Sequence, residues 1–153
     1  MSAQGKVELN IESCARCLPV VRSAVERMAT MEGFGDTDAH ALTLAIDEAL
    51  ANVIKHGYDG RPDQPITITL SPTMSEDGRP GIAVEVRDYG RQVDPQSIQG
   101  RNLDDVRPGG LGVHIIRAVM DVCEYSCPSE GGMLLRMVKY VARQGEATGV
   151  QAG

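Results

Sequence analysis

Apolar and polar side chains recur with two different periods along the chain, and the period predicts the type of each element. Alternation at every second residue, which is typical of a half-buried strand, predicts strands over residues 7–11, 66–70, 81–88, 122–127 and 133–141. Apolar residues at steps of three and four predict helices over residues 18–32 and 37–56, and a third helix that begins near residue 111. Residues 89–110 lack a strong period, and a loop of this length in a compact domain favours a lid or a binding loop.

The order of these elements predicts the fold class. Strands and helices do not alternate strictly, and the simplest arrangement that buries their apolar faces is an α+β two-layer sandwich. In it, a mixed or antiparallel sheet, with a hairpin formed by residues 66–70 and 81–88, is covered on one face by about three helices. The length of 153 residues favours a single domain. We expect this domain over residues 1–142 and a disordered polar tail over residues 143–153.

Composition and charge exclude several classes of protein. The chain has 15 Lys and Arg against 21 Asp and Glu, a net charge of −6, no basic run and no Trp. It therefore lacks both the positive surface and the aromatic platforms on which nucleic-acid binding depends. No apolar stretch approaches the length of a membrane span, and the first residues lack the apolar core of a signal peptide. We expect a cytoplasmic protein with no direct nucleic-acid or membrane contact and with its cysteines as thiols.

Three groups of residues could carry chemistry, and the first is the pair Glu48 and Asn52. Their spacing of four places them side by side on a face of the second helix that is separate from its apolar stripe. The small residues Ala41 and Ala45 lie nearby and leave room for a ligand. A solvated polar face would show the same pattern, so this pair alone does not decide the function.

The other two groups are Asp88 with Gly90, and the glycines Gly109, Gly110 and Gly112. A carboxylate at the end of a strand can accept a hydrogen bond from an exocyclic amine such as that of adenine, and a nearby glycine permits close backbone approach. Glycines at a helix start expose N–H groups and the positive end of the helix dipole, which suits phosphates. A plain turn is the alternative interpretation of each group.

Together these groups resemble the sequence boxes of the histidine-kinase-like ATPase fold, which gyrase, Hsp90, MutL and the histidine kinases share. Residues 45–58 are similar to its N box, residues 86–90 to its first glycine box and residues 109–116 to its second. Within that fold, residues 7–141 most resemble the short anti-sigma-factor serine kinases, whose N box runs on into a segment like Lys-His-Gly-Tyr here at residues 55–58. Gln92 departs from the pattern, because many members have glycine at that position.

The resemblance implies a site for ATP and Mg²⁺. It implies that Asn52 is a ligand of Mg²⁺, that Glu48 is the general base and that Asp88 binds the adenine amine. The other residues that it assigns to the nucleotide are His56, Gly90, Gly109, Gly110, Leu111 and Gly112. Arg101 and Arg107 in the long loop are candidate phosphate contacts, although ordinary surface arginines would look the same.

The four cysteines form two closely spaced pairs, Cys14 with Cys17 and Cys123 with Cys127. A zinc site built from all four is conceivable, as is redox chemistry at Cys14 beside a helix start. Half-buried free thiols are the simpler interpretation.

The function that the resemblance implies is an ATP-binding anti-sigma regulatory factor with serine/threonine-protein kinase activity. Its expected partners are a sigma factor and a small anti-sigma-factor antagonist of the STAS type, in a partner-switching system, and it is expected to form a homodimer. Two alternatives stay open. One is a catalytically weak nucleotide-binding module that acts by sequestering a partner, and the other is an ATP-dependent switch for a different signalling partner.

Overall fold

The computed structural model describes residues 5–95 and 110–143, and side chains of the second segment from residue 115 onward. Five strands form one sheet: β1 (Val7–Glu12), β2 (Pro65–Met74), β3 (Pro80–Asp88), β4 (Val122–Ser126) and β5 (Leu134–Tyr140). The strands lie in the order β1-β2-β3-β5-β4, and every neighbouring pair is antiparallel.

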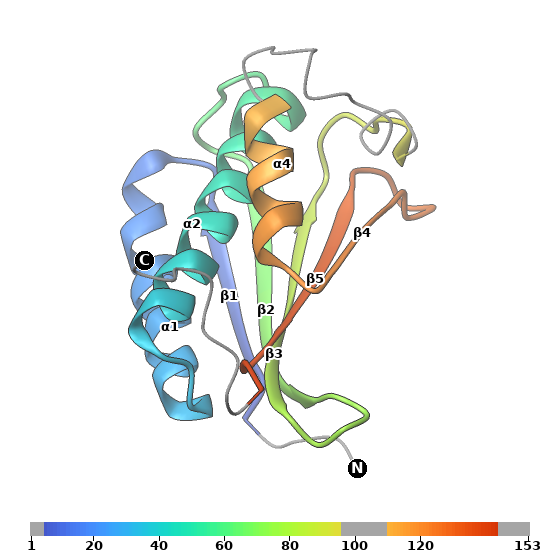
Figure 1. The fold of residues 1–153 in the computed structure, drawn as a ribbon. Coiled ribbons are helices and arrows are strands. Elements are labelled where there is room, and N and C mark those ends of the chain that lie inside the picture. The colour runs from blue at the N-terminus through green and yellow to red at the C-terminus, as the bar shows by residue number, and fades with distance from the viewer. Residues whose placement is uncertain (1–4, 96–109, 144–153) are drawn as a thin grey trace.

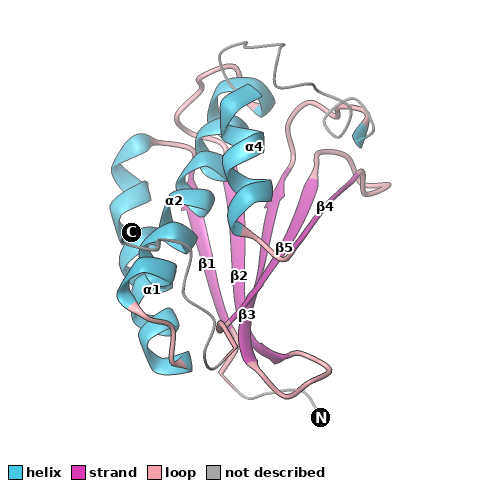
Figure 2. Ribbon diagram, viewed as in Figure 1, coloured by secondary structure: helices cyan, strands magenta, loops and turns pink. Residues whose placement is uncertain are grey.

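Three α-helices cover one face of this sheet: α1 (Leu18–Glu32), α2 (Asp36–Asn52) and α4 (Gly110–Val119) (Figure 1). A 3-10 helix, η1 (Ala15–Cys17), precedes α1, and a single π-helical turn, η2 (Val53–Gly57), extends α2. The two layers are visible in Figure 2. The expected α+β two-layer fold is confirmed, and the sheet is antiparallel throughout. In the described part of the chain, no helix combines the length and apolar character that a membrane crossing needs.

The core between the layers is aliphatic, as the shortage of aromatic residues predicts. Side chains of α1 and α2 pack against the inner faces of the strands, and Phe34 and Tyr58 are the only phenyl rings that the described residues contribute to the buried core cluster. The inner positions that carry this packing are Val21, Val25, Leu42, Ile46, Leu50, Ile66, Ile68, Leu70, Ile82, Val84, Val86, Leu135 and Met137.

Strand register explains why Asp88 is buried. The expected hairpin is present as the pair β2 and β3, in which Ile68 lies opposite Val86 and Ile66 lies opposite Asp88. Since side chains alternate between the two faces of a strand, Asp88 continues the inward series of Ile82, Val84 and Val86. The last residue of β3 therefore places a carboxylate on the face that the helices cover.

Candidate functional site

The end of α2, the end of β3 and the start of α4 lie at the same end of the molecule (Figure 1). The transition out of α2 is the π-helical turn η2, in which the Tyr58 N–H donates to the Val53 carbonyl at 3.0 Å. Such turns inside or at the end of α-helices occur frequently at functional sites. The turn brings the backbone of Gly57 toward the residues that follow β3.

Gly57 and Gly90 hold these two segments together by direct backbone contact. The N–H of Arg91 donates to the Gly57 carbonyl at 3.0 Å, and a Cβ atom on Gly90 would lie 2.3 Å from that same oxygen. Only glycine fits at residue 90, because any side chain would push the two segments apart. Gly90 therefore allows the segment after β3 to lie directly against Gly57, at the end of the predicted N box.

Asp88 is the buried carboxylate of this region, with 2% of its surface exposed. Its Oδ1 accepts the Gly90 N–H at 2.9 Å, and its own N–H donates to the Met133 carbonyl at 3.0 Å. Burial raises the pKa of Asp88, and the hydrogen bond from Gly90 only partly opposes this. The backbone around Met133 also stabilises the charged form of the Asp88 carboxylate, which therefore lies between the Gly90 segment and the turn before β5.

Tyr58 is a residue of this region that sequence reasoning did not assign to the site. Its side chain is 1% exposed, and its hydroxyl donates to the Pro65 carbonyl at 2.6 Å and accepts the Tyr89 N–H at 2.7 Å. Burial raises the pKa of this phenol, so the group stays protonated and remains a donor. Tyr58 therefore ties the start of β2 to the segment after Asp88.

Gly132, in the turn between β4 and β5, was also missed. It has φ +71°, and a Cβ atom there would lie 2.0 Å from the Asp88 carbonyl oxygen. The sequence signal was the pair Gly131-Gly132 directly before a strand, which predicts a turn but does not reveal what the turn packs against.

Glu48 and Asn52 lie one turn apart on α2, the helix that packs against both α1 and α4. Both side chains are half-buried, and neither makes a hydrogen bond or ion pair with a residue in the described segments. His56 is exposed in η2. The helix α4 begins at Gly110, so Gly110, Leu111 and Gly112 form its first turn, whose N–H groups have no partner inside the helix. Gly109, Arg101 and Arg107 lie outside the described residues.

The two cysteine pairs lie at opposite edges of the sheet. Cys14 and Cys17 follow β1, while Cys123 and Cys127 lie in and just after β4, and three strands separate β1 from β4. A zinc site built from all four cysteines is therefore not formed. Within the described residues, no group of three or more His, Cys, Asp and Glu side chains is arranged to hold a metal ion.

Comparison with known proteins identifies the class to which this fold and site belong. Residues 11–139 match the histidine kinase-like ATPase domain family, and the chain belongs to that family. Membership in an ATPase domain family implies ATP binding, as the three sequence boxes predicted.

Individual relatives show which members of this family the chain is similar to. The chain is 24% identical to the serine-protein kinase RsbW of Staphylococcus epidermidis over 151 residues, which cover 94% of this chain and 91% of that protein. It is 27% identical to the serine-protein kinase RsbW of Halalkalibacterium halodurans, over 90% of this chain and 84% of that one. Its fold is similar to the crystal structure of the RsbU and RsbW domains of a Mycobacterium tuberculosis protein, with a TM-score of 0.63 and 15% identity. That match covers 92% of this chain and 34% of the solved one.

Proposed function

We propose that this chain is an ATP-dependent serine/threonine-protein kinase that phosphorylates a small STAS-type anti-sigma-factor antagonist and also binds a sigma factor. The observation that carries the proposal is the pair Glu48 and Asn52, one turn apart on α2 and without a partner among the described residues. The pair belongs to the same helix whose end contacts the Asp88 segment. Similarity to relatives named serine-protein kinases, over most of their length, supports a protein substrate.

The residues present fit an adenine nucleotide and Mg²⁺. The buried carboxylate of Asp88, at the end of β3, is of the type that can accept a hydrogen bond from the adenine amine. The first turn of α4, at Gly110, Leu111 and Gly112, would offer its N–H groups to the phosphates, with Gly109 before it and His56 at the rim. The amide oxygen of Asn52 is a hard ligand of the kind that Mg²⁺ prefers.

Glu48 would act on the protein substrate. It would accept the proton of the serine or threonine hydroxyl as that oxygen attacks the terminal phosphorus of ATP, and the bond to the leaving ADP breaks. Bound Mg²⁺ would supply charge neutralisation at the phosphates. Phosphoryl transfer depends mainly on positioning and charge neutralisation, so this short set of groups is sufficient.

The direct test is transfer from labelled ATP to a candidate antagonist in the presence of Mg²⁺. The proposal expects phosphoserine or phosphothreonine on the antagonist, and Glu48→Gln should lower the rate by about 10²–10⁴-fold with ATP binding retained. Asp47→Asn is the matched control, because Asp47 faces α1 and lies 3.4 Å from Arg22. It should retain transfer.

The outcomes separate the competing functions. Transfer that survives in Glu48→Gln would remove Glu48 as the base. ATP binding without transfer to any antagonist would favour the sequestering module, and transfer to an unrelated signalling protein would favour the alternative switch. Sedimentation of the chain with and without the antagonist tests the homodimer that the resemblance implies.

A further inference from the structure

Cys14 and Cys17 are placed to react with each other. Cys14 directly precedes the short helix η1 between β1 and α1, Cys17 is the last residue of η1, and their Sγ atoms lie 3.5 Å apart. The N–H of Cys17 donates to the Cys14 carbonyl at 3.1 Å, which closes a tight turn. A turn of this kind keeps the two Cα atoms within about 7 Å, the range that a disulfide spans. Both side chains are half-buried, so a small reagent can reach them.

We propose that Cys14 and Cys17 form a reversible dithiol–disulfide site, and that its state alters the loop of residues 58–64. The second part concerns the proposed nucleotide site and rests on the function proposed above. The first part does not depend on that function. Neither part involves Cys123 or Cys127, at the opposite edge of the sheet.

The oxidant would be a low-molecular-weight disulfide, by thiol–disulfide exchange. The hydrogen bond between the two thiols raises the pKa of Cys17, which favours Cys14 as the residue that attacks first. Cys14 sulfur displaces one thiol of the small disulfide and forms a mixed disulfide. Cys17 then attacks the Cys14 sulfur and displaces the second thiol. In total, the two protein thiols are oxidised to a disulfide and the small disulfide is reduced to two thiols. The two protons lost by Cys14 and Cys17 end on those two small thiols.

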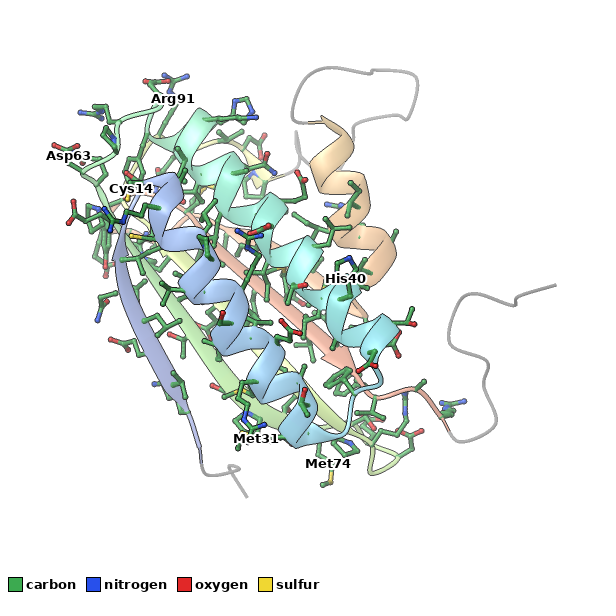
Figure 3. All side chains as sticks on the ribbon, turned by 90° about the vertical axis from the view of Figure 1, so that its left-hand side faces the viewer. Cys14, Met31, His40, Asp63, Met74 and Arg91 are labelled. Carbon is green, nitrogen blue, oxygen red and sulfur yellow. The ribbon has the colours of Figure 1, made fainter. Side chains whose placement is uncertain are left out.

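Ser13 connects this pair to the loop. It is 1% exposed, its N–H donates to the Gln64 carbonyl at 2.8 Å, and its Oγ accepts the Gln64 N–H at 3.0 Å and donates to the Arg61 carbonyl. The N–H of Arg61 in turn donates to the Tyr58 carbonyl at 3.0 Å. Figure 3 shows Cys14, Asp63 and Arg91 at one end of the molecule.

Bond formation acts at one end of this connection. The two sulfur atoms have to close from 3.5 Å to a bond length of about 2.05 Å, which turns both side chains, and the proposed coupling requires that the backbone of the tight turn shifts with them. Because Ser13 directly precedes Cys14 and is held by three hydrogen bonds, the shift reaches residues 61–64 and the Tyr58 backbone.

Mass spectrometry of the full chain tests the disulfide. The purified protein is equilibrated with oxidised and reduced glutathione, quenched with an alkylating reagent and digested with trypsin. Trypsin cleaves after Lys6, Arg16 and Arg22, so the disulfide should join two separate peptides, residues 7–16 and 17–22. The joined pair should appear in the wild type and in Cys123→Ser/Cys127→Ser, and vanish on reduction.

Two results would overturn the disulfide. One is that both cysteines stay open to alkylation at every glutathione ratio that oxidises a reference C-x-x-C protein. The other is that each cysteine ends as a separate mixed disulfide with glutathione.

Amide hydrogen exchange tests the coupling without any nucleotide. In the double variant Cys123→Ser/Cys127→Ser, oxidation should change the amide exchange rates at Ser13 and over residues 58–64 several-fold. The exchange rates of residues in β3 should stay unchanged. Equal exchange in both redox states would refute the coupling even if the disulfide forms. The dissociation constant for Mg-ATP should also shift several-fold. A chain that binds ATP in neither state would contradict the proposed function and leave the mass and exchange results intact.

Discussion

At the scale of single residues, Asp88 and Tyr58 show how one side chain gains a role from its surroundings. Asp88 is one of three polar or charged residues that are buried within the described segments. Its burial costs free energy, since the charged form is removed from water. Buried ionisable groups with a raised pKa cluster at functional sites, which favours a ligand-binding role for Asp88.

Asp88→Asn should therefore weaken nucleotide binding without weakening the fold. Loss of a hydrogen bond to a charged group should lower ATP affinity about tenfold or more, about 1.4 kcal/mol, measured by calorimetry. Stability at pH 7 should be unchanged or higher, because a buried charge is gone. Glu85→Gln, on the exposed face of the same strand, is the control. Unaltered ATP affinity in Asp88→Asn would remove Asp88 from the adenine site.

The raised pKa of Asp88 also predicts a pH dependence. The native state binds this proton more tightly than the unfolded state, so the contribution of Asp88 to the free energy of unfolding rises as pH falls through the raised pKa toward 3.8. Urea unfolding across mildly acidic pH should show this rise in the wild type relative to Asp88→Asn. Parallel curves for the two proteins would contradict it.

Tyr58→Phe removes one oxygen that serves two backbone groups. The Pro65 carbonyl and the Tyr89 N–H would lose their partner, at a cost of about 1–3 kcal/mol in unfolding free energy, measured with urea. Tyr140→Phe is the control, because the Tyr140 hydroxyl bonds to none of the described residues. Equal stability of the two variants would show that the bridge contributes little.

At the scale of elements, the turn between β4 and β5 supports the end of β3. Gly131 and Gly132 both have positive φ, but only Gly132 lies against the Asp88 and Tyr89 backbone. The site thus depends on an element about 40 residues further along the chain, which reaches Asp88 because β5 pairs with β3.

This difference predicts unequal effects of the same substitution. Gly131→Ala should cost about 1–2 kcal/mol, the strain of a left-handed residue. Gly132→Ala adds a clash with backbone that cannot move aside, so it should cost about 3 kcal/mol or more and also weaken ATP binding. Thermal and urea unfolding compare the two. Equal losses of unfolding free energy in the two variants would show that the clash with the Asp88 backbone is relieved easily.

At the scale of the whole molecule, ATP should bind the folded chain and stabilise it. At a ligand concentration 100 times the dissociation constant, linkage gives about 2.7 kcal/mol, which is about 5–10 °C in Tm for a domain of this size. Removal of Mg²⁺ with a chelator should reduce the shift in the wild type. Asn52→Ala should show a smaller shift that no longer responds to Mg²⁺, and continued response would reassign the metal ligand.

Local sequence patterns were sufficient to predict much of the fold. The strands and helices followed from apolar periods of two and of three to four, because those periods come from backbone geometry alone. The pair Glu48 and Asn52 could be named for the same reason, since a spacing of four on one helix fixes their neighbourhood.

The sequence by itself determined the class of each element, the aliphatic character of the core and the side-by-side placement of Glu48 and Asn52. Only the tertiary structure decided that the sheet is antiparallel throughout, that Gly132 packs against Asp88, that Tyr58 bridges β2 and the end of β3, and that the two cysteine pairs lie at opposite edges. The physical reason is that these contacts join residues far apart along the chain. Strand order and register set them, and local propensity carries no information about either.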